Sequence, residues 1–122
     1  MDYEIIENTL KTQIFEVCFD HDIQTVIRHN NVYVVLLGSQ DINCKISRAL
    51  RTNVYGVNSC GEIIWRIQDT RSFEGNNNVD LSLIIDIEKD KDGNLFAYTF
   101  TGTKYRFDST TGKLLEGICL YW

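Results

Sequence analysis

VYGVNSCGEII, at residues 54–64, recurs as KYRFDSTTGKLL at residues 104–115, and this repetition decides the fold. Each stretch contains a strand-forming run with a tyrosine, a turn that starts Asn-Ser or Asp-Ser, a glycine and a second apolar run. β-Branched and aromatic residues favour strands, whereas Asn, Asp and Gly tolerate the positive φ angles of tight turns. Each copy therefore predicts two neighbouring antiparallel strands.

The repetition extends toward the N-terminus, where Asn31-Val32-Tyr33-Val34 matches Asn94-Leu95-Phe96-Ala97. We interpret the chain as an internal duplication, with copies at about 23–68 and 80–120, in which each copy forms a four-stranded antiparallel meander. Further strand-like runs cover residues 14–19 and 23–28. The expected fold is a single all-β domain over residues 1–122, with two meanders packed as a sandwich or a flattened barrel.

The first copy carries an insertion, DINCKISRALR at residues 41–51. Ile42, Ile46 and Leu50 recur at a helical spacing, and Asp41 suits an N-cap. This segment is either a short helix or an extended loop.

The chain has 122 residues, of which 43% are hydrophobic, and a net charge of −5. Its longest apolar runs are far shorter than the ~18 residues that a membrane span needs. The acidic N-terminus does not resemble a secretion signal, so we expect a cytoplasmic protein. Acids dominate residues 1–22 and 74–92, whereas residues 28–71 are basic. This balance argues against nucleic acid and favours a basic protein partner.

No residue pattern indicates catalysis, a metal site or a cofactor, so we expect a protein that is not an enzyme. The four cysteines form no C-x-x-C pair and are expected to be reduced and mostly buried. Cys18 and His21 are close in sequence, but a buried cysteine beside a turn histidine is the simpler interpretation. Glu88-x-Asp90-x-Asp92-Gly93 imitates the start of a calcium loop, yet Thr99 stands where a bidentate glutamate is needed.

Two groups of residues are candidates for partner binding, a set of acids and a pair of aromatics outside the strands. The acidic stretch is either a binding surface or only a solvated face. Most other aromatics fall inside predicted strands and are expected in the core, among them Phe96 and Phe100. The partner-binding candidates are Glu74, Asp80, Asp86, Glu88, Asp90, Asp92, Phe73 and Trp122.

The stretch Tyr105–Leu115 resembles a blade of the quinoprotein-type β-propeller repeats. Glu116-Gly117 departs from that pattern where an aromatic is expected, although Trp65 occupies the corresponding place in the first copy. Two blades are too few to close a propeller, which needs about four to eight, so the family's cofactor site is not carried over. Open sheet edges could support a homodimer.

In size, charge and lack of reactive motifs, the chain resembles the small acidic immunity proteins of bacterial toxin systems, including those of contact-dependent growth inhibition. That resemblance implies an inhibitor that masks the active site of a basic, nuclease-type toxin. The alternative is a propeller-like scaffold, or a module that binds a peptide or small ligand.

Overall fold

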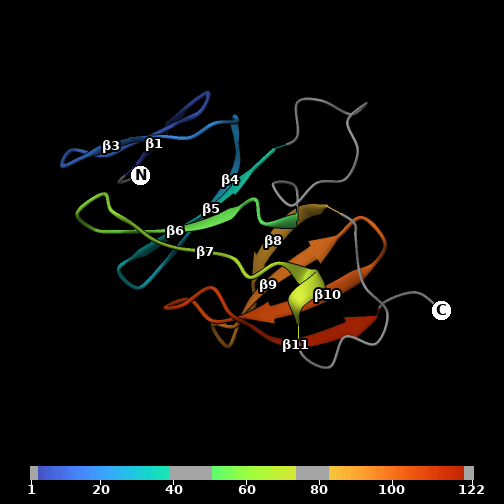
Figure 1. Ribbon diagram of the computed structural model, residues 1–122. Coiled ribbons are helices and arrows are strands. Elements are labelled where there is room, and N and C mark those ends of the chain that lie inside the picture. The colour runs from blue at the N-terminus through green and yellow to red at the C-terminus, as the bar shows by residue number, and fades with distance from the viewer. Residues whose placement is uncertain (1–2, 39–50, 74–82, 120–122) are drawn as a thin grey trace.

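The computed structural model describes residues 3–38, 51–73 and 83–119, which form three antiparallel sheets (Figure 1). The expected helix over 41–51 lies outside the described residues except for Arg51. Sheet A contains β1 (Glu4–Ile6), β2 (Thr9–Lys11) and β3 (Glu16–Cys18). Sheet B contains β4 (Ile23–His29), β5 (Val32–Leu37), β6 (Val54–Asn58) and β7 (Ile63–Arg66). Sheet C contains β8 (Ile84–Lys89), β9 (Leu95–Thr99), β10 (Thr103–Phe107) and β11 (Leu114–Cys119). A 3-10 turn, η1 (Thr70–Ser72), follows β7.

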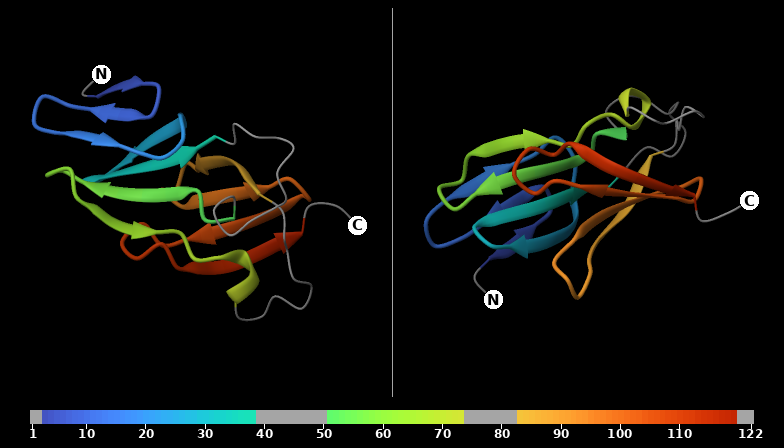
Figure 2. Two further views of the ribbon diagram at one scale, coloured as in Figure 1. Left: turned by 45° about the horizontal axis from the view of Figure 1, so that its top comes forward. Right: turned by 90° about the horizontal axis from the view of Figure 1, so that it is seen from below.

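The all-β class and the two packed four-stranded meanders are confirmed, since sheets B and C each run in chain order. The sheets do not close into a barrel, and they number three, not two. Of sheet A only β3 was expected, within the strand-like run 14–19; β1 and β2 were not, because strands of three residues are too short for alternation to be read. The three sheets are stacked in the order A, B, C (Figure 2).

Sheet B is buried on both faces. Tyr33 and Val35 of β5 point into an apolar cluster shared with sheet A, and Val34 and Leu36 point into a second cluster shared with sheet C. A strand covered on both sides has no polar face, which explains why β5 reads as a continuous apolar run.

The indole of Trp65 is the centre of the contact between sheets B and C. Its Nε1 donates a hydrogen bond to the Ser109 carbonyl at 2.7 Å, and its ring packs edge-on against Phe107. Two glycines, Gly56 of β6 and Gly112 of the β10–β11 turn, give it room, because a Cβ at either would overlap the ring. The strongest repeat signal in the sequence thus surrounds the main inter-sheet contact.

Polar side chains also join the same two sheets. The buried amide of Asn53 donates to the Leu37 carbonyl at 2.8 Å and to the Ile84 carbonyl at 3.0 Å. Gln24 of β4 donates to the Ile85 carbonyl of β8 at 2.9 Å. The first strands of sheets B and C therefore lie beside each other, as Figure 1 also shows.

Sheets B and C carry the same irregularities in the same places. A register shift follows Ile23 in sheet B and Ile84 in sheet C, and a second shift follows Gly56 and Arg106. This pattern makes Gly56 the counterpart of Arg106 and Trp65 the counterpart of Glu116.

The upstream match derived from the sequence is wrong by one residue. Gly56 pairs with Val34 and Arg106 pairs with Phe96, so Phe96 corresponds to Val34 and not to Tyr33. A shift of one residue moves a strand side chain to the opposite face of its sheet. The similarity of Asn31 and Asn94 set the wrong register, because asparagine begins both runs.

Two expectations about burial are also wrong. Cys18 and Cys60 are exposed free thiols; Cys18 lies beside Thr9 on the outward side of sheet A, and Cys60 lies in the β6–β7 turn. Phe100 is 73% exposed, because it belongs to the turn after β9 and not to the strand. Among the described residues, no sheet packs over the side chains of Cys18, Cys60 or Phe100.

Candidate functional site

The face of sheet C that points away from sheet B is the candidate site, and we name it the outer face. Strand register places its members in two rows across the four strands, alternating with core residues such as Ala97 and Tyr105. One row is Asp86, Tyr98, Lys104 and Ile118; the other is Glu88, Phe96, Arg106 and Glu116.

Each position of the outer face has a counterpart on the face of sheet B that is turned toward sheet C. Trp65 is replaced by Glu116, Val54 by Lys104 and Gly56 by Arg106. The remaining exchanges follow the same register: Thr25 to Asp86, Ile27 to Glu88, Val34 to Phe96, Leu36 to Tyr98 and Ile67 to Ile118. A face that stacks on another sheet has thus become a face of charges with two aromatic rings.

The aromatic rings lie under a lysine. The Nζ of Lys104 stands 4.1 Å from the ring centroid of Phe96 and 5.6 Å from that of Tyr98. A cation over a ring face is attracted by the ring quadrupole, and its aliphatic stem covers apolar surface. The Lys104 side chain thus helps to keep Phe96 only 8% exposed, although none of the described sheets lies over it.

Acids lie on both sides of these central groups. On β8, Glu88 accepts a hydrogen bond from the Tyr98 hydroxyl at 2.8 Å. Burial raises the pKa of Tyr98, and the bond to Glu88 raises it further. On β11, Glu116 lies 4.0 Å from Arg106, an exposed pair of small energetic value. The outer face is therefore acidic at its two edges and basic along its centre, not uniformly acidic.

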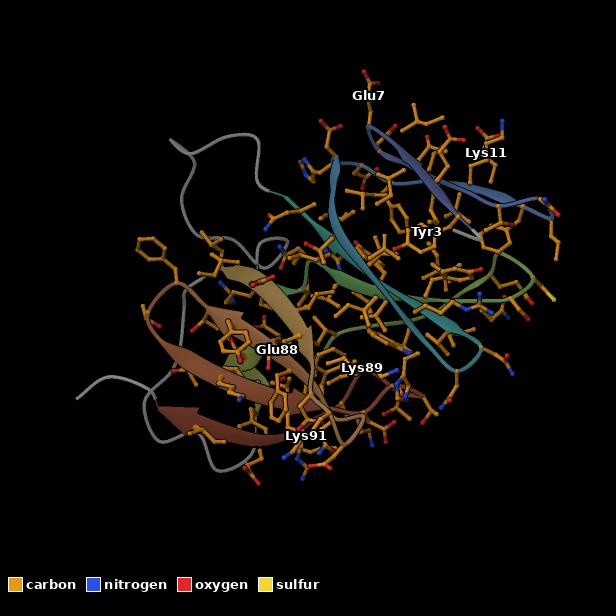
Figure 3. All side chains as sticks on the ribbon, turned by 180° about the vertical axis from the view of Figure 1, so that it is seen from behind. Tyr3, Glu7, Lys11, Glu88, Lys89 and Lys91 are labelled. Carbon is orange, nitrogen blue, oxygen red and sulfur yellow. The ribbon has the colours of Figure 1, made fainter. Side chains whose placement is uncertain are left out.

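The remaining predicted acids on this side belong to the β8–β9 turn. The Asp90 carboxylate accepts hydrogen bonds from the backbone N–H groups of Asp92 and Asn94, at 2.9 and 2.8 Å. The bond from Asn94 is the main reason that the pKa of Asp90 lies below its usual range. Asp90 thus shapes the turn, which Gly93 completes with a positive φ, whereas Asp92 is exposed. Lys89 and Lys91 alternate with these acids (Figure 3).

Of the eight predicted partner-binding residues, the structure brings four together: Asp86 and Glu88 on the outer face, with Asp90 and Asp92 in the adjoining turn. Phe73 is on the other side of sheet C, half-buried against Tyr105 in the core. Glu74, Asp80 and Trp122 lie outside the described residues.

Sequence reasoning missed Phe96, Tyr98, Lys104, Arg106 and Glu116. The signal was present, because Lys104 and Arg106 alternate with Tyr105 and Phe107, so the two cations must share the face opposite the core. What the sequence did not reveal was that Phe96 shares the face of the cations.

A second acidic surface lies at the other end of the molecule, on sheet A (Figure 3). Glu4, Lys11 and Glu16 face one another across its three strands. Glu7, Asp20 and Asp22 are exposed. Two backbone hydrogen bonds hold the segment 19–23 against the β1–β2 turn: the Phe19 N–H donates to the Asn8 carbonyl, and the Ile23 N–H donates to the Glu7 carbonyl. This surface contains five acids against one lysine, so it is more one-sided in charge than the outer face.

Within the described part of the chain, no three histidine, cysteine or acidic side chains gather as metal ligands would. The same residues contain no helix with the length and apolar character of a membrane span.

These features define a class of protein built from stacked antiparallel sheets, with a polar face at each end of the stack. The chain belongs to the family described as a domain of unknown function, DUF7957, whose model matches residues 1–117. No curated protein matches the sequence.

A computationally designed protein, Ika8, is similar in structure, with a TM-score of 0.58 and 13% sequence identity. The match covers 91% of this chain but only 30% of the designed one, so the chain spans under a third of that protein's length. At this identity the likeness concerns the fold alone. The resemblances to quinoprotein blades and to immunity proteins stay predictions.

Proposed function

We propose that this chain is a protein-binding inhibitor that uses the outer face of sheet C to bind and mask a basic protein. In the form that the sequence suggests, the partner is a nuclease-type toxin and the chain is its immunity protein in a bacterial cytoplasm. The observation that carries the proposal is the exchange, position by position, of stacking residues in sheet B for charged and aromatic residues in sheet C.

Each type of residue on the outer face has a role in such a complex. Aromatic side chains are enriched at the centres of protein interfaces, which suits Phe96 and Tyr98. Carboxylates such as Asp86 and Glu88 attract a positively charged surface and raise the rate of encounter. Lys104 and Arg106 would then contact acids of the partner, which gives the face a charge pattern that rejects uniformly basic surfaces.

The test begins with the native partner. The tagged protein is purified from its host, the companion proteins are identified by mass spectrometry, and the main companion is produced separately. We expect a basic protein whose activity this chain abolishes at a one-to-one ratio. A companion that is only a second copy of this chain would refute the proposal.

The face is then tested with charge reversal. The double variant Asp86→Lys, Glu88→Lys should weaken the complex by roughly 30-fold, because two close charge pairs of about 1 kcal/mol each become repulsive or are lost. Glu62→Lys makes the same kind of change in the β6–β7 turn of sheet B and is the matched control. Equal affinities for the double variant and the wild-type protein would place the contact elsewhere.

A second candidate function, peptide or small-ligand binding, is favoured by a hollow of about 600 Å³ between sheet A and the end of sheet B. Its lining includes Phe15 and Tyr33, packed edge to face, and Arg28, whose guanidinium lies 4.9 Å from the Tyr33 ring centroid. Ile14, 80% exposed, stands at its rim. A screen of acidic aromatic peptides should then find ligands whose affinity falls in Ile14→Asp; if every such ligand bound this variant equally well, the hollow would not be their site.

A further inference from the structure

Sheet A has three strands, whereas sheets B and C have four. The aromatic residues after the last strands show which strand is missing. Phe19 follows β3 and packs on Tyr55 of sheet B at 5.3 Å between ring centroids, as Phe73 follows η1 after β7 and packs on Tyr105 of sheet C at 5.8 Å. β3 therefore corresponds to β7, and β1 to β5. Within residues 3–38, 51–73 and 83–119, sheet A has no counterpart of the first strand, β4 or β8.

The edge where this strand would lie is exposed. Among the described residues, β1 pairs with β2 alone. Ile5 and Ile6 on β1 are 39% and 47% exposed. A strand edge of this kind presents backbone donors and acceptors to another chain. In an antiparallel ladder closed by the two-residue turn Glu7-Asn8, the pair Ile6–Thr9 is hydrogen-bonded, so the N–H and C=O of Ile5 point outward.

The neighbouring sheet supplies a second contact for an added strand. The first strands of sheets B and C are joined by the bond from the Gln24 side chain to the Ile85 carbonyl. Gln24 and Ile85 are themselves counterparts, since each is the extra residue of the register shift in its strand. A strand beside β1 would meet β4 at Gln24, just as β4 meets β8 at Ile85.

The charges around β1 define what this strand would be. Glu4 lies on β1, Glu7 in the next turn, and Asp20 and Asp22 in the segment held against that turn. A basic segment would be attracted to this edge. Two copies of this chain paired through β1 would bring two acidic edges together, which is electrostatically unfavourable.

We infer that β1 binds an extended, basic segment of a partner protein, which adds to sheet A as an antiparallel fourth strand. The segment alternates an apolar residue, directed toward sheet B, with Lys or Arg directed toward the acids of sheet A. Backbone pairing of this type gives affinity, and alternate side chains give specificity. This inference shares a basic partner with the proposed function but concerns the opposite end of the stack, and it is tested separately.

The probe is a synthetic seven-residue peptide that alternates Lys and Val, with both ends blocked. Binding to the isotope-labelled full chain is followed by amide chemical shifts and amide exchange. We expect shift changes confined to β1, β2 and β4, and slower exchange of the Ile5 amide. The variant Glu4→Lys, Glu7→Lys should weaken binding at least about tenfold, whereas Glu62→Lys should leave it unchanged.

A second peptide, with proline in place of the central valine, separates strand addition from simple charge attraction. Proline cannot donate a ladder hydrogen bond, so this peptide should bind at least about tenfold more weakly. Equal binding of the two peptides, shift changes centred on sheet C, or dimers that form through β1 in sedimentation experiments would each overturn the inference. Asp86→Lys, Glu88→Lys should not change peptide binding, so this inference and the proposed function can fail independently.

Discussion

Gly56→Ala is the substitution whose effect follows most directly from the structure. A Cβ at Gly56 would lie 2.2 Å from Cε2 of Trp65, 2.4 Å from Nε1 and 2.7 Å from Cζ2. Ordinary contact begins at 3.4 Å, so the indole must retreat by about 1.2 Å (3.4 − 2.2). The φ angle of Gly56 is not in the left-handed region, so the effect of the substitution is steric and not a backbone penalty.

The indole has little freedom to retreat. Gly112 is also close to the ring, since a Cβ there would lie 2.7 Å from Cε3, and the bond from Nε1 to the Ser109 carbonyl holds the indole in place. Over-packing a core costs about 1–3 kcal/mol, and this confined site places the cost near the upper end. Alanine also restricts the unfolded chain, which returns about 0.4–1 kcal/mol. We therefore expect the free energy of unfolding to fall by about 2 kcal/mol.

The assay is urea unfolding followed by far-UV circular dichroism. For a urea dependence of about 1–3 kcal/mol per molar, the midpoint should fall by roughly 1 M. Gly38→Ala is the matched control, because its Cβ would meet only ordinary contacts at 3.5 Å or more. In a Trp65→Phe background the cost of Gly56→Ala should fall by at least half. An unchanged midpoint, or an equal cost in both backgrounds, would refute the packing described for Trp65.

Three further predictions concern polar groups. Asn53→Ala removes two buried hydrogen bonds, one to the Leu37 carbonyl of sheet B and one to the Ile84 carbonyl of sheet C, so urea unfolding should show a loss of about 1–3 kcal/mol; a neutral result would mean that these bonds do not stabilise the fold. Burial, with a smaller effect from Lys89, lowers the pKa of His29 below its ordinary 6.5. As the pH falls, His29 therefore binds a proton more readily in the unfolded chain than in the folded one. The free energy of unfolding should therefore fall as pH drops below 6.5, and His29→Gln should flatten that part of the profile; an unchanged slope would rule out His29 as the source. Asp90→Ala should lower the urea midpoint because two backbone N–H groups lose their acceptor, whereas Asp90→Asn should retain most of the stability; equal midpoints for the two variants would contradict that role of the carboxylate.

Turn chemistry and strand alternation were sufficient to predict much of the fold. Gly61 and Gly112 have positive φ angles in the turns that the sequence repeat had placed between strands. The order of the strands within each meander follows from such turns, because short turns leave consecutive strands as neighbours. The run 14–19 anticipated β3, but sheet A as a whole was not predicted, because its short strands are ordered by contact with sheet B, through residues such as Leu10 and Phe19, and not by a pattern of their own.

The outer face was harder to predict for a different reason. Residue type suggested that Phe96 is the repeat counterpart of Tyr33, whereas the strand register makes it the counterpart of Val34. The two alignments of the repeat, with Phe96 matched to Tyr33 or to Val34, are distinguished only by the positions of the register shifts. These shifts depend on tertiary packing, and neither strand has a residue pattern that reveals them. The acids of β8 could be found as a group, but their alternation with Lys104 and Arg106 across the sheet required the pairing of all four strands.

The exposed faces at the two ends of the stack have different chemistry, and this difference bears on the function proposed for the outer face, not on the β1 edge. A repeat at the end of a stack needs only a polar exterior to stay soluble. Sheet A meets that need with Glu4, Lys11 and Glu16. The outer face of sheet C instead keeps Phe96 and Tyr98 beneath Lys104, an arrangement that solubility does not require. If the proposed function holds, a partner carboxylate that draws Lys104 aside would uncover more of the Phe96 ring, so a partner that can bind the lysine would gain additional apolar contact area.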